Sequence, residues 1–133
     1  MFEQLILVGN LGGDPSMKYL DSGKAVTNFS IATSESWTDQ GGEKHDRTKW
    51  WRVAVFGKSA EACNQFLKKG SRVLVHGKMT ATPEGNPRVW NDNSGNPRAS
   101  FEVTAEAVKF LSPRGEGGGQ SQSSDEDSDN IPF

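Results

Sequence analysis

The chain has 133 residues, enough for one domain and a tail, and its hydrophobic fraction of 33% is low for a fully globular protein. Its formal net charge of −2 excludes a strongly basic protein overall, but the charge is unevenly distributed. Residues 112–133 carry one base and five acids, whereas residues 1–111 carry 14 bases and 12 acids. We therefore predict a mildly basic folded domain over 1–111 and an acidic tail.

Several classes of protein are disfavoured by the composition. The single cysteine, Cys63, cannot form an intramolecular disulfide, and it is not spaced with His45 and His76 as a metal cluster. No apolar run approaches the roughly 20 residues of a membrane span, and the N-terminus does not resemble a signal peptide. No nucleophile–base constellation or phosphate-binding loop is present. We expect a cytoplasmic protein that is not an enzyme and needs no metal or cofactor.

The first half of the chain reads as a series of strands. Apolar runs bounded by Gly, Pro, Asp and Ser predict strands at 5–8, 17–20, 25–34 and 49–56, with a hairpin turn at 21–24. The stretch 38–48 is polar and leaves nothing to bury, so we predict a flexible excursion there. Trp37 stands at one end of this excursion and Trp50 at the other.

One helix is predicted near the middle of the chain. Ser59 is a plausible N-cap, and Gly70 is a plausible stop after Lys68 and Lys69 in the last turn. Apolar residues at helical spacing define the expected buried face, namely Ala62, Cys63, Phe66 and Leu67. We interpret Cys63 as a small core residue, because no catalytic partner can be assigned to it.

The second half returns to strands. Residues 71–79 and 99–111 alternate as strands, and prolines and glycines break the stretch 80–97 into a long hairpin or arm that carries Arg88 and Trp90. The order of the elements fits an all-β, five-stranded OB-fold barrel with one helix between its third and fourth strands. OB-folds commonly hold oligonucleotides on a strand face and its loops.

The strand at 49–56 has two different faces. Trp51, Val53 and Val55 share an apolar face, whereas Trp50, Arg52 and Phe56 share the other. Rings beside a guanidinium form a platform on which nucleic-acid bases can stack. The strand alone leaves a second reading open, in which both faces are buried and Arg52 reaches a nearby carboxylate.

After residue 111 the composition changes abruptly. Residues 112–124 are rich in Gly, Ser and Gln and predict a flexible linker. The final segment, 125–133, is acidic and then apolar, which favours a short docking peptide over a frayed end. Its expected partner-binding residues are Asp127, Asp129, Asn130, Ile131, Pro132 and Phe133.

Motifs along the whole chain together resemble the bacterial single-stranded DNA-binding protein family. They are ILVGNLG at 6–12, DP at 14–15, ATSESW at 32–37, WWRV at 50–53, FGK at 56–58, LKKGS at 67–71 and DNIPF at 129–133. The resemblance implies an OB-fold, a homotetramer, wrapped single-stranded DNA, and a tip that recruits replication, recombination and repair proteins. It also places Trp51 at a position that faces a neighbouring subunit.

The same resemblance implies a set of DNA-binding residues. The stacking rings fall on Trp37, Trp50, Phe56 and Trp90, and the phosphate-contacting bases on Lys18, Arg52, Lys58, Lys69 and Arg88. Two other functions remain open: an RNA-binding OB module of the cold-shock type, and an adaptor whose tail is the working part.

Overall fold

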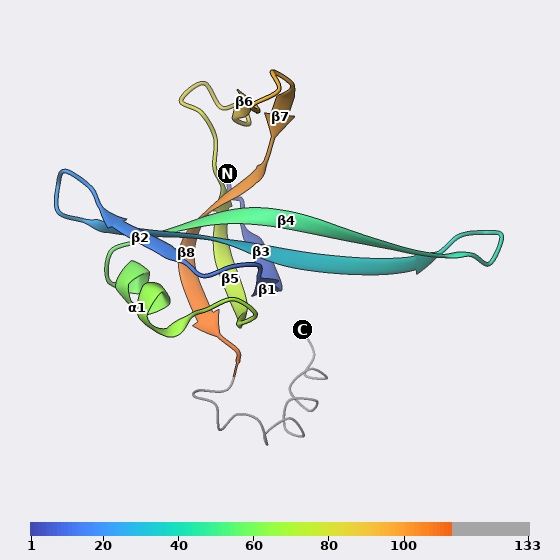
Figure 1. The fold of residues 1–133 in the computed structure, drawn as a ribbon, viewed down its shortest axis with the longest axis horizontal. Coiled ribbons are helices and arrows are strands. Elements are labelled where there is room, and N and C mark those ends of the chain that lie inside the picture. The colour runs from blue at the N-terminus through green and yellow to red at the C-terminus, as the bar shows by residue number, and fades with distance from the viewer. Residues whose placement is uncertain (113–133) are drawn as a thin grey trace.

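The computed structural model describes residues 1–112, so the predicted linker and acidic tip lie outside the described residues. Within residues 1–112, eight strands and one helix follow one another (Figure 1). They are β1 (Leu5–Leu11), β2 (Ser16–Tyr19), β3 (Ala25–Thr38), β4 (Lys44–Phe56), α1 (Lys58–Phe66), β5 (Arg72–Met79), β6 (Val89–Asn91), β7 (Pro97–Ala99) and β8 (Phe101–Phe110). Within this described part, no helix is long and apolar enough to cross a membrane.

Five strands close into a barrel in the order β1-β5-β8-β4-β3, and short pairing between β1 and β3 completes the ring. The β4–β8 pair is parallel and the others are antiparallel. Closure needs a close backbone approach at Gly9, where a Cβ would lie 2.3 Å from the Ala32 carbonyl oxygen. The helix stands between β4 and β5, the third and fourth barrel strands, so the predicted OB-fold is confirmed.

The barrel core follows from the alternation of the strands. The largest fully buried side chains are Thr27, Ile31, Val53, Val55, Cys63, Val73, Val75 and Val103. The Thr27 hydroxyl donates to the Ala60 carbonyl over 2.6 Å and so ties α1 to β3. Burial raises the pKa of the Cys63 thiol to about 11, which keeps it protonated and agrees with the predicted core role.

The helix differs from the prediction at both ends. Its N-cap is Gly57 at φ 78°, not Ser59, because glycine adopts this conformation without strain and lets the helix begin earlier. The chain is already extended at Leu67, so the prediction that Lys68 and Lys69 lie in the last turn is wrong. Phe66 is about half exposed, and Ala60 takes a place on the buried face.

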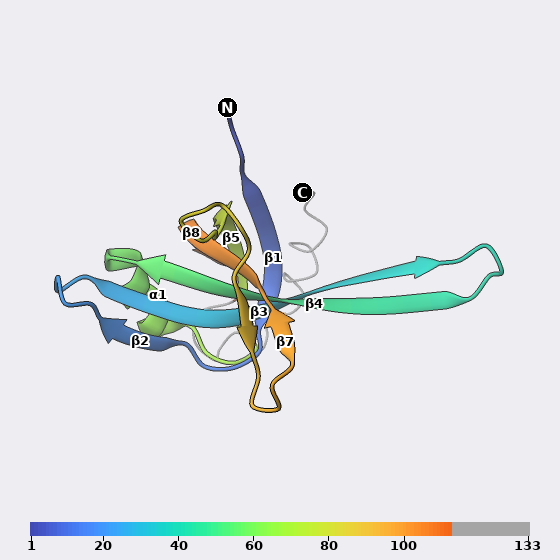
Figure 2. The same cartoon turned by 90° about the horizontal axis from the view of Figure 1, so that it is seen from above.

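The predicted flexible excursion at 38–48 is wrong. β3 and β4 pair continuously from Val26↔Phe56 to Thr38↔Lys44, and only residues 39–43 form the turn. Figures 1 and 2 show that this β3–β4 ribbon extends well beyond the barrel. Its cross-strand polar pairs, such as Arg47 with Glu35 and Ser36 with Asp46, stabilise the ladder without a core.

The predicted arm at 80–97 is confirmed as the β6–β7 hairpin and its flanking loops. In Figure 1 the arm and α1 lie on opposite sides of the β3–β4 ribbon. The arm returns directly into β8, so its position is set by the strand that lies beside β4 in the barrel.

Candidate nucleic-acid interface

The two faces of β4 are as different in the structure as in the sequence. Trp50 is 53% exposed and Arg52 is exposed, whereas Trp51 is 7% exposed. The reading in which both faces are buried is therefore wrong. Trp51 packs inside its own chain: its ring centroid lies 4.9 Å from that of Phe101, and its indole N–H donates to the Thr33 hydroxyl over 2.9 Å.

Side chains that lie opposite one another on paired strands point to the same face. Ser30 lies opposite Arg52, and Lys18 and Phe56 flank Val26 from its two sides. On the parallel neighbour β8, Glu102 lies beside Arg52. This surface, here called the outer face, comprises Lys18, Asn28, Ser30, Trp50, Arg52, Phe56 and Glu102.

A groove of about 470 Å³ runs along the outer face. Gly12, Gly13 and Asp14 line one side, and the other lining residues come from β3 and β4 and include Trp50 and Arg52. The loop after α1 is fixed against this turn, because the Lys69 amide donates to the Asp14 carboxylate over 2.9 Å. Lys69 is therefore held near the groove, and exposed Lys58 begins α1 two residues after Phe56.

The indole of Trp50 rests against Gly12. A Cβ at Gly12 would lie 2.4 Å from a ring carbon, which is closer than van der Waals contact allows. Because the ring is the free end of an exposed side chain, it can move aside at little cost to folding. Glycine at this position thus sets the tilt of the ring over the groove.

Gly12→Ala should therefore displace the Trp50 ring and weaken binding of oligo(dT) by about threefold or more, with little change in melting temperature. The matched control is Gly13→Ala in the same turn, where an added Cβ meets nothing within 4 Å. Fluorescence titration and thermal unfolding of both variants check this expectation. Equal affinity of Gly12→Ala and Gly13→Ala would contradict the positioning role of Gly12.

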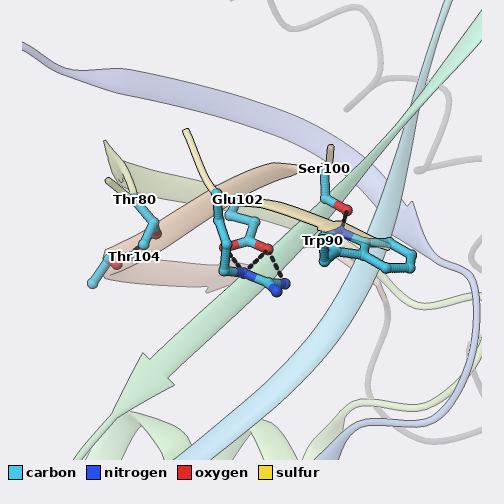
Figure 3. Close-up of polar contacts among 6 residues, drawn as sticks. Thr80, Trp90, Ser100, Glu102 and Thr104 are labelled. Atoms are coloured by element: carbon cyan, nitrogen blue, oxygen red, sulfur yellow. Dashed lines mark hydrogen bonds and ion pairs between the residues drawn. The ribbon is translucent and has the colours of Figure 1, made fainter. Parts of the chain in front are cut away.

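Three side-chain contacts join the arm to β8 and to Ser100 just before it (Figure 3). The hydroxyls of Thr80 and Thr104 lie 2.8 Å apart. The Trp90 indole N–H donates to the Ser100 hydroxyl at 3.4 Å. Arg88 forms a forked ion pair with Glu102, with its Nη2 2.5 Å and its Nε 3.1 Å from Oε2. The hydrogen bond from Arg88 and the charge of Glu102 raise the pKa of the guanidinium. The structure thus brings Arg88 to the outer face, where it is paired with a carboxylate, and places Trp90 on the arm beside Ser100.

Trp37 lies apart from this group. It is opposite His45 in the ladder, on the same side of the ribbon as Trp51, so Trp37 and Trp50 point to opposite faces. Trp37 and Trp50 do not flank one loop as the sequence suggested. Trp50 is opposite Ala32, which precedes Trp37 on β3 by five residues, or roughly 16 Å. The Trp37 ring stacks on His45 with centroids 5.4 Å apart, and the Arg47 guanidinium lies 4.9 Å from its centroid.

The ribbon turn gathers groups that the sequence reading missed. Asp39, Glu43 and His45 place possible ligand atoms within 4.8 Å of one another. The Asp39 carboxylate accepts hydrogen bonds from the His45 ring and the Glu43 amide, which lower its pKa. These bonds close the turn and explain the cluster structurally. Only the pairing of 38 with 44, invisible in a polar stretch, brings the three together.

An OB-fold barrel whose outer face combines exposed rings with positive charge defines a class of oligonucleotide-binding domains. Comparison with protein families matches residues 2–111 to the Single-strand binding protein family, and the chain belongs to that family. Among solved structures it is similar to "Plasmodium falciparum SSB complex with ssDNA", with a TM-score of 0.69 and 28% sequence identity. The match covers 83% of this chain and 95% of the Plasmodium chain.

Proposed function

We propose that this protein binds single-stranded DNA without sequence preference. The observation that carries the proposal is that exposed Trp50 and Arg52 lie side by side on one face of β4 and both line the groove on the outer face. Family membership and the likeness to a Plasmodium protein solved with single-stranded DNA support it. The proposed stacking rings are Trp37, Trp50, Phe56 and Trp90, and the proposed phosphate contacts are Lys18, Arg52, Lys58, Lys69 and Arg88.

Two interactions contribute to the proposed binding, base stacking and contacts between cations and phosphates. A base stacked on an aromatic side chain contributes about 1–3 kcal/mol, and every base offers a π-face, so stacking tolerates any sequence. Lysine and arginine at phosphates release counterions, so affinity should fall as salt rises. Since Trp37 lies on the other side of the ribbon, the strand must pass around the ribbon to contact Trp37 and Trp50 together.

Competition between oligo(dT) and oligo(U) of equal length tests the class of ligand. We expect oligo(dT) to displace oligo(U) from the protein, and measurements at several salt concentrations separate base stacking from charge. A clear preference for oligo(U) would reject DNA as the ligand and favour the RNA-binding alternative.

We further propose that the protein acts as a homotetramer. Besides the family resemblance, the support is an apolar surface on β1, where Ile6 and Val8 are exposed and pair with His76 and Leu74 of β5. Isolated exposed apolar residues are common, but adjacent ones on a sheet favour an interface. Measurement of the solution mass decides between four subunits and a monomer.

We propose that the acidic tail binds partner proteins and not DNA. These partners are proteins of replication, recombination and repair, and the proposed location is the cytoplasm, at the nucleoid. Deletion of residues 125–133 should leave oligo(dT) affinity unchanged or raise it, because the removed acids repel phosphate. Binding of replication and repair proteins should be lost in the same variant, as a pull-down with purified partners would record. Loss of oligo(dT) binding on deletion would contradict this division and favour the adaptor alternative.

A further inference from the structure

Glu102 is an unexpected residue on a surface suited to phosphate. Its carboxylate is on the outer face beside Arg52 in the β4–β8 register, and its side chain is 16% exposed. A carboxylate there repels a nucleic-acid backbone unless a cation is paired with it. Arg88 supplies that cation through the forked contact at 2.5 and 3.1 Å.

The contact matters because carboxylate and phosphate oxygens both accept charge-assisted hydrogen bonds from a guanidinium. Here Nη2 and Nε of Arg88 both lie close to Oε2, and Nε is also 3.4 Å from Oε1. Arg88 therefore holds in the free protein the kind of group that it would hold in a complex with DNA. The pair also attaches the arm to the barrel, together with the contact between the hydroxyls of Thr80, at the start of the arm, and Thr104 of β8 (Figure 3). Arg88 is half exposed, so a phosphate can reach it from solvent.

We infer that Glu102 is an internal phosphate substitute, which docks the arm on the outer face through Arg88 until a backbone phosphate of single-stranded DNA replaces it. The inference rests on the proposed function. When Arg88 transfers to the phosphate, Glu102 loses its ion-pair partner and takes up a cation from solution. The part of the arm that carries Arg88 is then attached to the DNA instead of to Glu102 of the barrel, and Trp90 moves with it.

This exchange predicts a specific salt dependence. In the wild-type protein, a DNA phosphate that binds Arg88 releases its counterion, while Glu102 loses Arg88 and takes up a counterion. The two changes cancel, so the Arg88 contact adds nothing to the slope of log K against log salt. In Glu102→Gln, Arg88 is free beforehand, and its contact should steepen the slope of log K against log salt by about 0.7 per chain. At low salt the variant should bind oligo(dT) more tightly, by up to about fivefold, because no surface ion pair has to be broken.

Two variants isolate the cause. Glu106→Gln on the same strand makes the same charge change and removes a carboxylate 3.9 Å from Lys78, so it should keep the wild-type slope. Arg88→Gln combined with Glu102→Gln should also restore the wild-type slope, because the freed guanidinium is gone. Anisotropy titrations with labelled oligo(dT) at four salt concentrations measure all of these slopes.

Hydrogen exchange without DNA tests the docked arm separately. Peptides from residues 85–99 should exchange faster in Glu102→Gln than in the wild type and Glu106→Gln. Unchanged exchange would overturn docking by Glu102, and faster exchange with an unchanged slope would overturn its role as a phosphate substitute. If the wild type fails to bind oligo(dT), the proposed function is overturned, and so is the competition between Glu102 and phosphate. The hydrogen-exchange result would still decide whether Glu102 docks the arm.

Discussion

Trp50→Ala should weaken oligo(dT) binding by about 1–3 kcal/mol per chain, which is roughly 5- to 150-fold in affinity. The indole is 53% exposed beside the groove, so its removal takes away a stacking surface without opening a cavity in the core. The melting temperature should change by only a few degrees. Fluorescence-anisotropy titration and thermal unfolding of the same preparation provide both values.

The opposite pattern would place Trp50 in the core. If Trp50→Ala melts the domain and leaves the affinity of the remaining folded protein unchanged, the ring is structural and the outer face is not a stacking platform. Trp50→Phe is a useful intermediate, because it keeps an aromatic face and should retain most of the binding.

Trp51→Ala should destabilise the fold by about 3–5 kcal/mol, the usual cost of removing a large buried aromatic side chain. Trp51 is 7% exposed, it packs on Phe101, and its N–H is bonded to Thr33. In a domain of this size the loss corresponds to a fall of more than about 10 °C in melting temperature. Thermal unfolding followed by circular dichroism measures it.

The neighbouring residues Trp50 and Trp51 thus form a matched pair, one expected to change binding and the other stability. Solution mass of Trp51→Ala adds a further test, since the family resemblance places this position at a subunit interface. A variant that stays stable but loses its oligomeric state would contradict the core role, and would show that the ring serves assembly.

Much of the barrel follows from the sequence because its strands alternate. In β4 the period of two separates Trp51, Val53 and Val55 from Trp50 and Arg52, and the structure reproduces this division. The helix α1 and the position of the arm also follow from local signals. These features depend on burial, which leaves a pattern in the chain.

The β3–β4 ribbon could not be predicted in the same way. Its outer part has no buried side, so residues 38–48 carry no hydrophobic period, and the ladder depends on cross-strand pairs such as Arg47 with Glu35. The side of Trp37 follows only from the register of this ladder. The Arg88–Glu102 pair likewise joins residues whose contact depends on the path of the arm.

Tryptophan fluorescence during titration with oligo(dT) tests the proposed function most directly. Stacking of bases on the exposed indoles of Trp37 and Trp50 and on the partly buried indole of Trp90 should quench the emission strongly and saturably, while buried Trp51 keeps part of the signal. Salt added to the complex should restore the emission, because phosphate contacts hold the strand on the rings. No quenching at low salt, with the protein folded and oligo(dT) in excess, would contradict single-stranded DNA binding by the outer face.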